Sequence, residues 1–257
     1  MKNAILLLLL PLILPACHTA PKTGTAPASL YETTEDSLTL FDTARNRLIP
    51  VALYLPKTSN KIRHQKVVIF SHGYGANEPG ANKAYTYLTE MLAAQGCFVA
   101  SIQHELPTDS LLAMSGNFRV TRRPNWERGA QNILFVLNRL KKLHPELDYR
   151  HLILIGHSNG GDMSMLFAQL YPDMVDKVIS LDNKRMPFPR AARPRVYSLR
   201  ADDDPADPGV LPTPYEQKKY GIKIIYLKGI KHGDMSSYGT AEQHRTIEAQ
   251  VLAFLRD

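Results

Sequence analysis

The chain has 257 residues, of which 44% are hydrophobic and 21% are charged. This composition is typical of one large globular domain and excludes an intrinsically disordered chain. No internal repeat is visible, which excludes solenoids and propellers. Lysine and arginine outnumber the acidic residues by 31 to 24, a net charge of +7. Because no basic helix or nucleic-acid motif accompanies this excess, we expect no nucleic-acid partner.

The first residues are typical of an export signal. Lys2 is followed by an apolar run over residues 4–14 and then by Pro15, Ala16 and Cys17. A positive charge, a short apolar stretch and a small residue before the cut site indicate a secretory signal peptide. The run is shorter than the about 20 residues that span a bilayer. Residues 14–17 resemble the bacterial lipobox, in which the cysteine is acylated and becomes the first mature residue. We therefore expect residues 1–16 to be a lipoprotein signal peptide and Cys17 to carry lipid, which anchors the chain to a membrane.

Residues 17–34 are expected to form a flexible tether, because the stretch after Cys17 is rich in Pro, Thr, Ala and Gly. Residues 35–257 are expected to form the single folded domain. The expected location is the cell envelope, and His18 after the cysteine favours the outer membrane in a Gram-negative source. With Cys17 lipidated, Cys97 has no disulfide partner and is expected to be a buried small hydrophobe.

Apolar stretches suited to strands alternate with amphipathic stretches suited to helices. Residues 37–41 and 48–55 suggest an antiparallel opening pair. Further strands are predicted at 67–70, 98–102, 152–155, 177–181, 196–199 and 222–227, and helices at 82–94, 126–143, 158–170 and 241–255. This alternation predicts an α/β fold, a mostly parallel eight-stranded sheet with helices on both faces.

The stretch Gly-His-Ser-Asn-Gly at residues 156–160 follows a predicted buried strand and precedes a predicted helix. A serine between two glycines at a strand-to-helix turn is lifted above the sheet edge, and the glycines let strand and helix approach closely. We expect Ser158 to be a catalytic nucleophile.

A second glycine-rich turn, His-Gly-Tyr-Gly at residues 72–75, also follows a predicted strand. Backbone N–H groups in such a turn can stabilise an oxyanion. The expected donors are the N–H groups of Tyr74 and of Asn159, the residue after the nucleophile.

These two motifs, in this order, resemble the α/β-hydrolase fold over effectively the whole mature domain. Residues 47–56 are also similar to the second strand of the dienelactone-hydrolase and platelet-activating-factor-acetylhydrolase-like branches. The fold implies a triad in the chain order serine, acid, histidine.

His232 follows the last predicted strand and is the expected catalytic base; the only later histidine, His244, falls inside the final helix. The acid usually follows the penultimate strand, where four aspartates stand at residues 202–207. We favour Asp203 there, with Asp204 as the runner-up and Asp207 as a further alternative. Asp182, directly after the preceding strand, remains a fourth candidate.

The expected function is hydrolysis of a carboxylic ester, thioester or amide of a small acyl substrate through an acyl-enzyme intermediate. The alternatives are a non-catalytic binding lipoprotein of the same fold, or a peptidase or acyltransferase with the same triad. No clustered ligands indicate a metal and no phosphate-binding glycine loop opens a helix, so no cofactor is expected.

The link between the predicted strands at 177–181 and 196–199 is too short to hold a large cap domain. The longer segment at residues 103–125 can overhang the site, and its Arg119, Arg122 and Arg123 can meet an acidic group.

Overall fold

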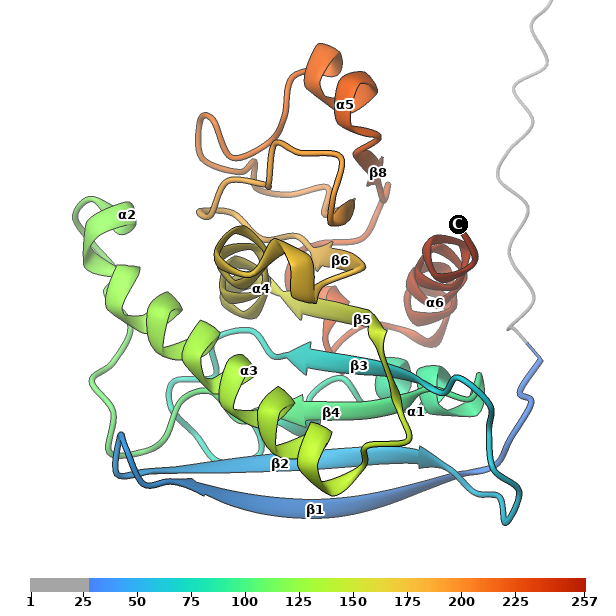
Figure 1. Ribbon diagram of the computed structural model, residues 1–257. Helices are drawn as coiled ribbons and strands as arrows, with labels where there is room; N and C mark the ends of the chain where they lie inside the picture. Colours follow the sequence, from blue (N-terminus) through green and yellow to red (C-terminus); the bar gives the residue numbers. More distant parts are fainter. Residues whose placement is uncertain (1–27) are drawn as a thin grey trace, which may run out of the picture.

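A twisted sheet of eight strands forms the centre of the computed structural model, which describes residues 28–257 (Figure 1). The strands lie side by side in the order β1-β2-β4-β3-β5-β6-β7-β8. Their bounds are β1 Thr33–Asp42, β2 Arg47–Pro56, β3 Lys66–Ser71, β4 Phe98–Ile102, β5 Asp148–His157, β6 Lys177–Leu181, β7 Arg195–Arg200 and β8 Lys223–Tyr226. Only β2 runs against its neighbours, pairing antiparallel with both β1 and β4, and the pairs from β4 to β8 are parallel.

Helices cover both faces of this sheet, so the central strands are buried on both sides. Their bounds are α1 Thr86–Ala94, α2 Phe118–Thr121, α3 Arg123–Leu143, α4 Ser158–Leu170, α5 Pro214–Tyr220 and α6 Ala241–Arg256. Helices α3 and α4 pack through Trp126, Ile133 and Leu166 against one face, while α1 and α6 pack through Leu88 and Ile247 against the other. The two apolar layers hold the strands rigidly, and the carboxyl ends of the parallel strands therefore form a fixed platform.

The predicted fold class is confirmed: the sheet has eight mostly parallel strands, helices flank it, and residues 28–257 contain no large cap. The link from β6 to β7, residues 182–194, contains neither helix nor strand. The short helices α2 and α5 were not predicted, because four and seven residues are too few to show a helical period. Cys97 is buried, as expected, and burial raises the pKa of its thiol to about 11.

The chain enters the domain along the end of α1. The backbone N–H groups of Leu30 and Tyr31 both donate to the carbonyl oxygen of Ala94, at 3.0 and 3.1 Å. Strand β1 begins at Thr33, two residues ahead of the expected domain boundary. The predicted signal peptide, Cys17 and most of the predicted tether lie outside the described residues. Among the described helices, none has the length and apolar character that a membrane span requires.

Candidate active site

Ser158 lies at an abrupt turn between β5 and α4. Strand β5 ends at His157 and the helix begins at the next residue, so no loop separates them. Ser158 has a φ of 51°, in the left-handed region that costs an L-residue about 1–2 kcal/mol. Side chains at Gly156 or Gly160 would collide with backbone, in the second case with the carbonyl groups of Ser71 and His72. The two glycines are therefore required by close packing, as the sequence motif predicts.

The structure brings His232 to this serine. His232 follows β8, and its Nε2 atom lies 2.8 Å from the Ser158 hydroxyl oxygen. On the other side of the ring, Nδ1 lies 2.6 Å from a carboxylate oxygen of Asp182. Because a carboxylate only accepts, Nδ1 carries the proton and Nε2 is free to accept the proton of Ser158. His244 lies elsewhere: its Nε2 donates to the carbonyl of Ser236, and its ring stacks on Tyr87.

The expectation that Asp203 lies against the imidazole ring of His232 is wrong. Both carboxylate oxygens of Asp203 accept from the backbone N–H of His232, at 3.0 Å, and not from its ring. Asp203 therefore holds the loop that carries the histidine. Asp182 takes the ring position because it stands directly at the end of β6, the strand beside β5.

The remaining aspartates of the β7–β8 link also form contacts within the loops around the site. Asp202 accepts from the N–H of Gly229 at 2.9 Å. Asp204, the runner-up for the acid, offers its backbone carbonyl to Lys184. Asp207 forms an ion pair with Arg185. None of these three carboxylates has a contact with the His232 ring among the described interactions.

Asp182 is fully buried and surrounded by cations. Arg200 at the end of β7 lies 2.7 Å from one carboxylate oxygen, and Lys184 lies 3.2 Å from the other. Burial by itself raises the pKa of Asp182, but the hydrogen bond from His232 and the charges of Arg200 and Lys184 outweigh burial and hold the pKa below its ordinary value. Asp182 therefore stays ionised at neutral pH and can stabilise a protonated His232.

Two backbone segments next to Ser158 have the placement that an oxyanion hole needs. A Cβ atom on Gly73 would lie 3.4 Å from the Cβ atom of Ser158, so the backbone that leads to Tyr74 passes directly over the nucleophile. Asn159 is in the first turn of α4, where N–H groups have no partner inside the helix. The roles of Tyr74 and Asn159 as oxyanion donors stay predictions that agree with this placement.

A buried polar cluster that the motifs did not reveal fixes Asn159. Its side-chain amide donates to Glu105 and to the side-chain oxygen of Asn125, both at 2.9 Å, and accepts from the Trp126 indole at 2.8 Å. Glu105 is only 1% exposed and also lies 3.5 Å from His72, which precedes the oxyanion turn. The one signal in the sequence was an ionisable residue, Glu105, three positions after the end of the buried strand β4.

A pocket of about 560 Å³ opens over Ser158 and His232. Besides these two, its lining contains Gly73, Tyr74, Gly75, Glu78, Pro79, Gly80, Ala81, Ala84, Tyr85, His157, Gly233, Ser236 and Tyr238. No leucine, isoleucine, valine, methionine or phenylalanine is among them. The pocket is therefore shaped by small and hydroxyl-bearing side chains and offers no long apolar channel.

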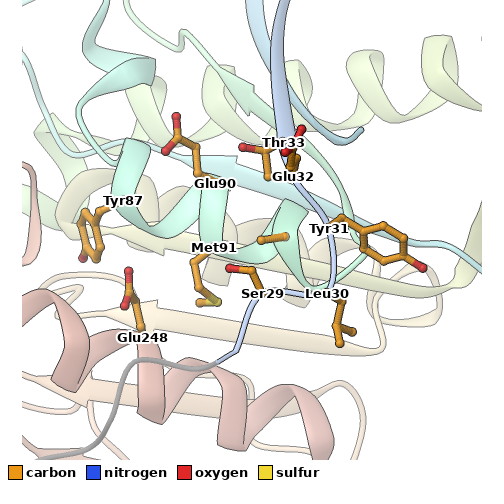
Figure 2. Close-up of a pocket in the computed structure, with 10 residues that line it drawn as sticks. Ser29, Leu30, Tyr31, Glu32, Thr33, Tyr87, Glu90, Met91 and Glu248 are labelled. Atoms are coloured by element: carbon orange, nitrogen blue, oxygen red, sulfur yellow. The ribbon is translucent and has the colours of Figure 1, made fainter. Parts of the chain in front are cut away.

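A larger cavity of about 700 Å³ lies away from the triad, between residues 29–33 and the helices α1 and α6 (Figure 2). Glu90 and Glu248 line it, and no triad residue does. The described residues contain no group of three or more His, Cys, Asp or Glu side chains suited to hold a metal ion.

The arginines of the overhanging segment are partly engaged within the protein. Arg123 pairs with Glu127 on the surface of α3, and Arg119 donates to the carbonyl of Pro208. Arg122 donates to the carbonyl of Ala113 and lies over the ring of Phe118 at 4.2 Å. Their predicted contact with an acidic substrate group stays a prediction.

Both the sequence and the structure of the chain are similar to those of known proteins. Residues 54–208, more than half of the chain, match the family described as alpha/beta hydrolase fold. Among solved structures, a fungal esterase from Rhizomucor miehei aligns with a TM-score of 0.64 and 14% identity, covering 92% of this chain and 85% of that one. A bacterial heroin esterase aligns at 0.62 and 13%, covering 88% and 84%. A dienelactone hydrolase-like promiscuous phosphotriesterase from metagenomic libraries aligns at 0.60 and 17%, covering 88% and 98%. No curated protein matches the sequence.

Proposed function

Because the chain belongs to the alpha/beta hydrolase fold family, we propose that it is a serine hydrolase that cleaves carboxylic esters through an acyl-enzyme intermediate. The observation that carries this proposal is the continuous contact from Ser158 through His232 to Asp182, at 2.8 and 2.6 Å. Solved esterases share the fold over most of the chain, which supports the same proposal.

In the proposed reaction, the Ser158 oxygen attacks the ester carbonyl while Nε2 of His232 takes the hydroxyl proton. The backbone N–H groups of Tyr74 and Asn159 stabilise the oxyanion that forms. His232 then gives its proton to the departing alcohol, which leaves an acyl group on Ser158. A water molecule, activated by His232 in the same way, releases the acid and restores the serine. Asp182 keeps the His232 ring in one tautomer throughout.

The pocket over the triad favours small substrates. Its lining holds three tyrosines but no leucine, isoleucine, valine, methionine or phenylalanine, so a long acyl chain finds no aliphatic channel for its CH₂ groups. Each buried CH₂ group is worth about 0.8 kcal/mol only where apolar walls receive it. We therefore expect nitrophenyl acetate and butyrate to be cleaved with higher kcat/KM than the octanoate and dodecanoate.

A fluorophosphonate probe tests the reaction class. The wild-type protein should be labelled once, on Ser158, and hydrolyse the short nitrophenyl esters. A folded protein that takes no label and cleaves no ester is the non-catalytic binding protein instead. A protein that takes the label and cleaves no ester, but cleaves a peptide, would be a peptidase. One that takes the label and transfers an acyl group to an added alcohol would be an acyltransferase. Hydrolysis of lactone rings beside linear esters tests our narrower proposal of a place in the dienelactone-hydrolase-like branch, which the similarity of residues 47–56 to the second strand of that branch supports.

We also propose that the protein is exported and anchored in the cell envelope through lipid on Cys17, on the strength of the N-terminal motif. Expressed in a bacterium, the wild type should sediment with membranes, partition into detergent and incorporate radioactive palmitate. Cys17→Ser should abolish all three, while Cys97→Ser, which alters the other cysteine, should not. A wild-type protein found wholly in the soluble fraction would contradict this proposal.

A further inference from the structure

We infer that Tyr85 and His157 act as positioning residues that fix three segments of the active site against one another. We call them the Tyr85–His157 relay. The inference rests on the proposed function, because its effect is on the reaction at Ser158. Neither residue is needed for the proton transfers described above.

The relay is a chain of three hydrogen bonds. The backbone N atom of Gly73 lies 3.0 Å from the Tyr85 hydroxyl, and that hydroxyl lies 2.7 Å from Nδ1 of His157. On the far side of the ring, Nε2 of His157 lies 3.0 Å from the backbone carbonyl oxygen of His232. Tyr85 and His157 are 3% and 5% exposed, so water does not compete for these bonds.

The direction of every bond in the relay follows from the groups at its two ends. The His232 carbonyl only accepts, so Nε2 of His157 carries the ring proton. Since burial and the neighbouring His232 lower the pKa of His157 to about 3, the ring is neutral and its Nδ1 atom has a free lone pair. The Tyr85 hydroxyl therefore donates to Nδ1, and its oxygen accepts from the N–H of Gly73. No donor faces a donor, so the three hydrogen bonds of the relay have one consistent arrangement of protons.

Each bond holds a different part of the site. Gly73 precedes Tyr74, so its bound N–H orients the turn that presents the oxyanion donor. His157 precedes Ser158, so the nucleophile cannot shift without moving the ring. The third bond holds the backbone of His232 itself. The approach is so close that a Cβ atom on Gly73 would lie 2.8 Å from Nδ1 of His157 and 2.9 Å from the Tyr85 oxygen. This contact explains why the residue before Tyr74 is a glycine.

The relay also keeps a second imidazole in place beside the catalytic one. The rings of His157 and His232 have centroids 4.5 Å apart. Because Nε2 of His157 donates to a carbonyl and Nδ1 accepts from Tyr85, this ring has no free nitrogen that competes with His232 for the proton of Ser158.

Steady-state kinetics on variants test the relay. We expect Tyr85→Phe and His157→Leu each to lower kcat by about 3- to 30-fold while KM stays within about twofold, because the lost bonds orient groups that act in the transition state. The double variant should be no slower than the slower single one, because both changes break the same chain. Tyr149→Phe is the matched control: like Tyr85→Phe it removes a tyrosine hydroxyl that donates a hydrogen bond, here from the start of β5 to the backbone carbonyl of His144. Its kcat should equal that of the wild type. Losses that add in the double variant, or a Tyr85→Phe protein no slower than Tyr149→Phe, would overturn the relay.

A spectroscopic measurement separates this inference from the proposed function. In protein labelled with ¹⁵N-histidine, the His157 ring at neutral pH should show a protonated Nε2 and an unprotonated Nδ1, and Tyr85→Phe should shift the Nδ1 signal. A protonated Nδ1 in the wild type would overturn the relay even if the enzyme is active. The expected tautomer in a protein without esterase activity would leave the relay standing and refute only the proposed function.

Discussion

Ser158 and Asp182 occupy equivalent positions at the ends of two neighbouring parallel strands. The last paired residues of β5 and β6 are His157 and Leu181, and each is followed at once by a triad residue. Both triad residues have left-handed backbone, with φ values of 51° and 55°. The same sharp exit from adjacent strands thus sets the nucleophile and the acid side by side, with room above them for the His232 ring.

Replacing Asp182 should therefore identify the acid. We expect Asp182→Asn to lower kcat by roughly 10²–10⁴-fold with little change in KM, because the amide no longer stabilises protonated His232. Asp203→Asn is the matched control, since the Asp203 carboxylate accepts from the backbone N–H of His232 and not from its ring. Its kcat should stay within about tenfold of the wild type, as one weakened hydrogen bond costs about 1 kcal/mol. Steady-state kinetics decide; a collapse in Asp203→Asn with normal turnover in Asp182→Asn would refute the assignment.

The strained backbone at Ser158 predicts an unusual stability order. Ser158→Ala and Ser158→Gly should both abolish fluorophosphonate labelling. Of the two, the glycine variant should unfold with a free energy about 1 kcal/mol higher, because glycine adopts positive φ without steric cost. Urea denaturation of both inactive proteins measures this difference. An alanine variant as stable as the glycine variant would show that the turn stores no strain.

Close packing at Gly160 predicts a severe effect from one methyl group. In Gly160→Ala the new Cβ atom meets the backbone carbonyls of Ser71 and His72, which cannot move aside. We expect a loss of about 3 kcal/mol in the free energy of unfolding, at the upper end of the usual cost of overpacking, together with loss of activity. Gly233→Ala provides the comparison, because no heavy atom lies within 4 Å of its added Cβ. Thermal melts of the two variants should differ clearly; equal melting temperatures would contradict the packing argument.

The buried His157 predicts that stability falls as the solution becomes acidic. Its pKa is lowered to about 3 by burial first and by the nearby charge of His232 second, with Lys184 adding to these and Asp182 opposing them. Between that value and the unfolded pKa of about 6.5, the unfolded chain binds a proton that the native protein does not. The contribution of neutral His157 to the free energy of unfolding is therefore fully present above about pH 6.5. Because of this residue, the free energy of unfolding should fall by about 2–3 kcal/mol from pH 7 to pH 4.5.

Comparison with a variant isolates that contribution. Buried His104, whose pKa burial also lowers, adds a decline of the same sign in every protein measured. His157→Gln removes one titrating ring but keeps an acceptor and a donor on the side chain. Urea denaturation at pH 7 and pH 4.5 should show that the free energy of unfolding falls by about 2–3 kcal/mol less in the variant than in the wild type. An identical decline in both proteins would mean that His157 does not titrate in this way.

The fold could be predicted from the sequence because buried parallel strands leave strong local signals. The apolar stretches before Ser158 and before the 72–75 turn are continuous, and the glycines beside them have one steric explanation. Ser158 follows β5 at once, and His232 lies in the loop that follows β8. The structure places them in contact, as their motifs led us to expect.

The acid could not be chosen from the sequence, because the choice depends on which strand end faces the histidine. The β7–β8 link contains four aspartates, whereas only Asp182 follows β6. The prediction therefore placed the acid in the β7–β8 link, which is the wrong loop. The deciding partner is Arg200, whose buried guanidinium balances the charge of Asp182 from the end of β7. The relay was likewise invisible, since Tyr85 and His157 are distant in the chain and meet only through the packing of α1 on the sheet.

The point where the chain enters the domain has a consequence for how an anchored protein meets its substrate. Leu30 and Tyr31 bind the end of α1, close to the amino end of β4, whereas Ser158 follows the carboxyl end of β5 (Figure 1). Because β4, β3 and β5 are parallel, these are opposite poles of the sheet. With lipid on Cys17, the pole that holds Leu30 would face the bilayer and the catalytic pole would face the aqueous compartment. Such an orientation suits the capture of dissolved esters and leaves the site turned away from lipids of the host membrane.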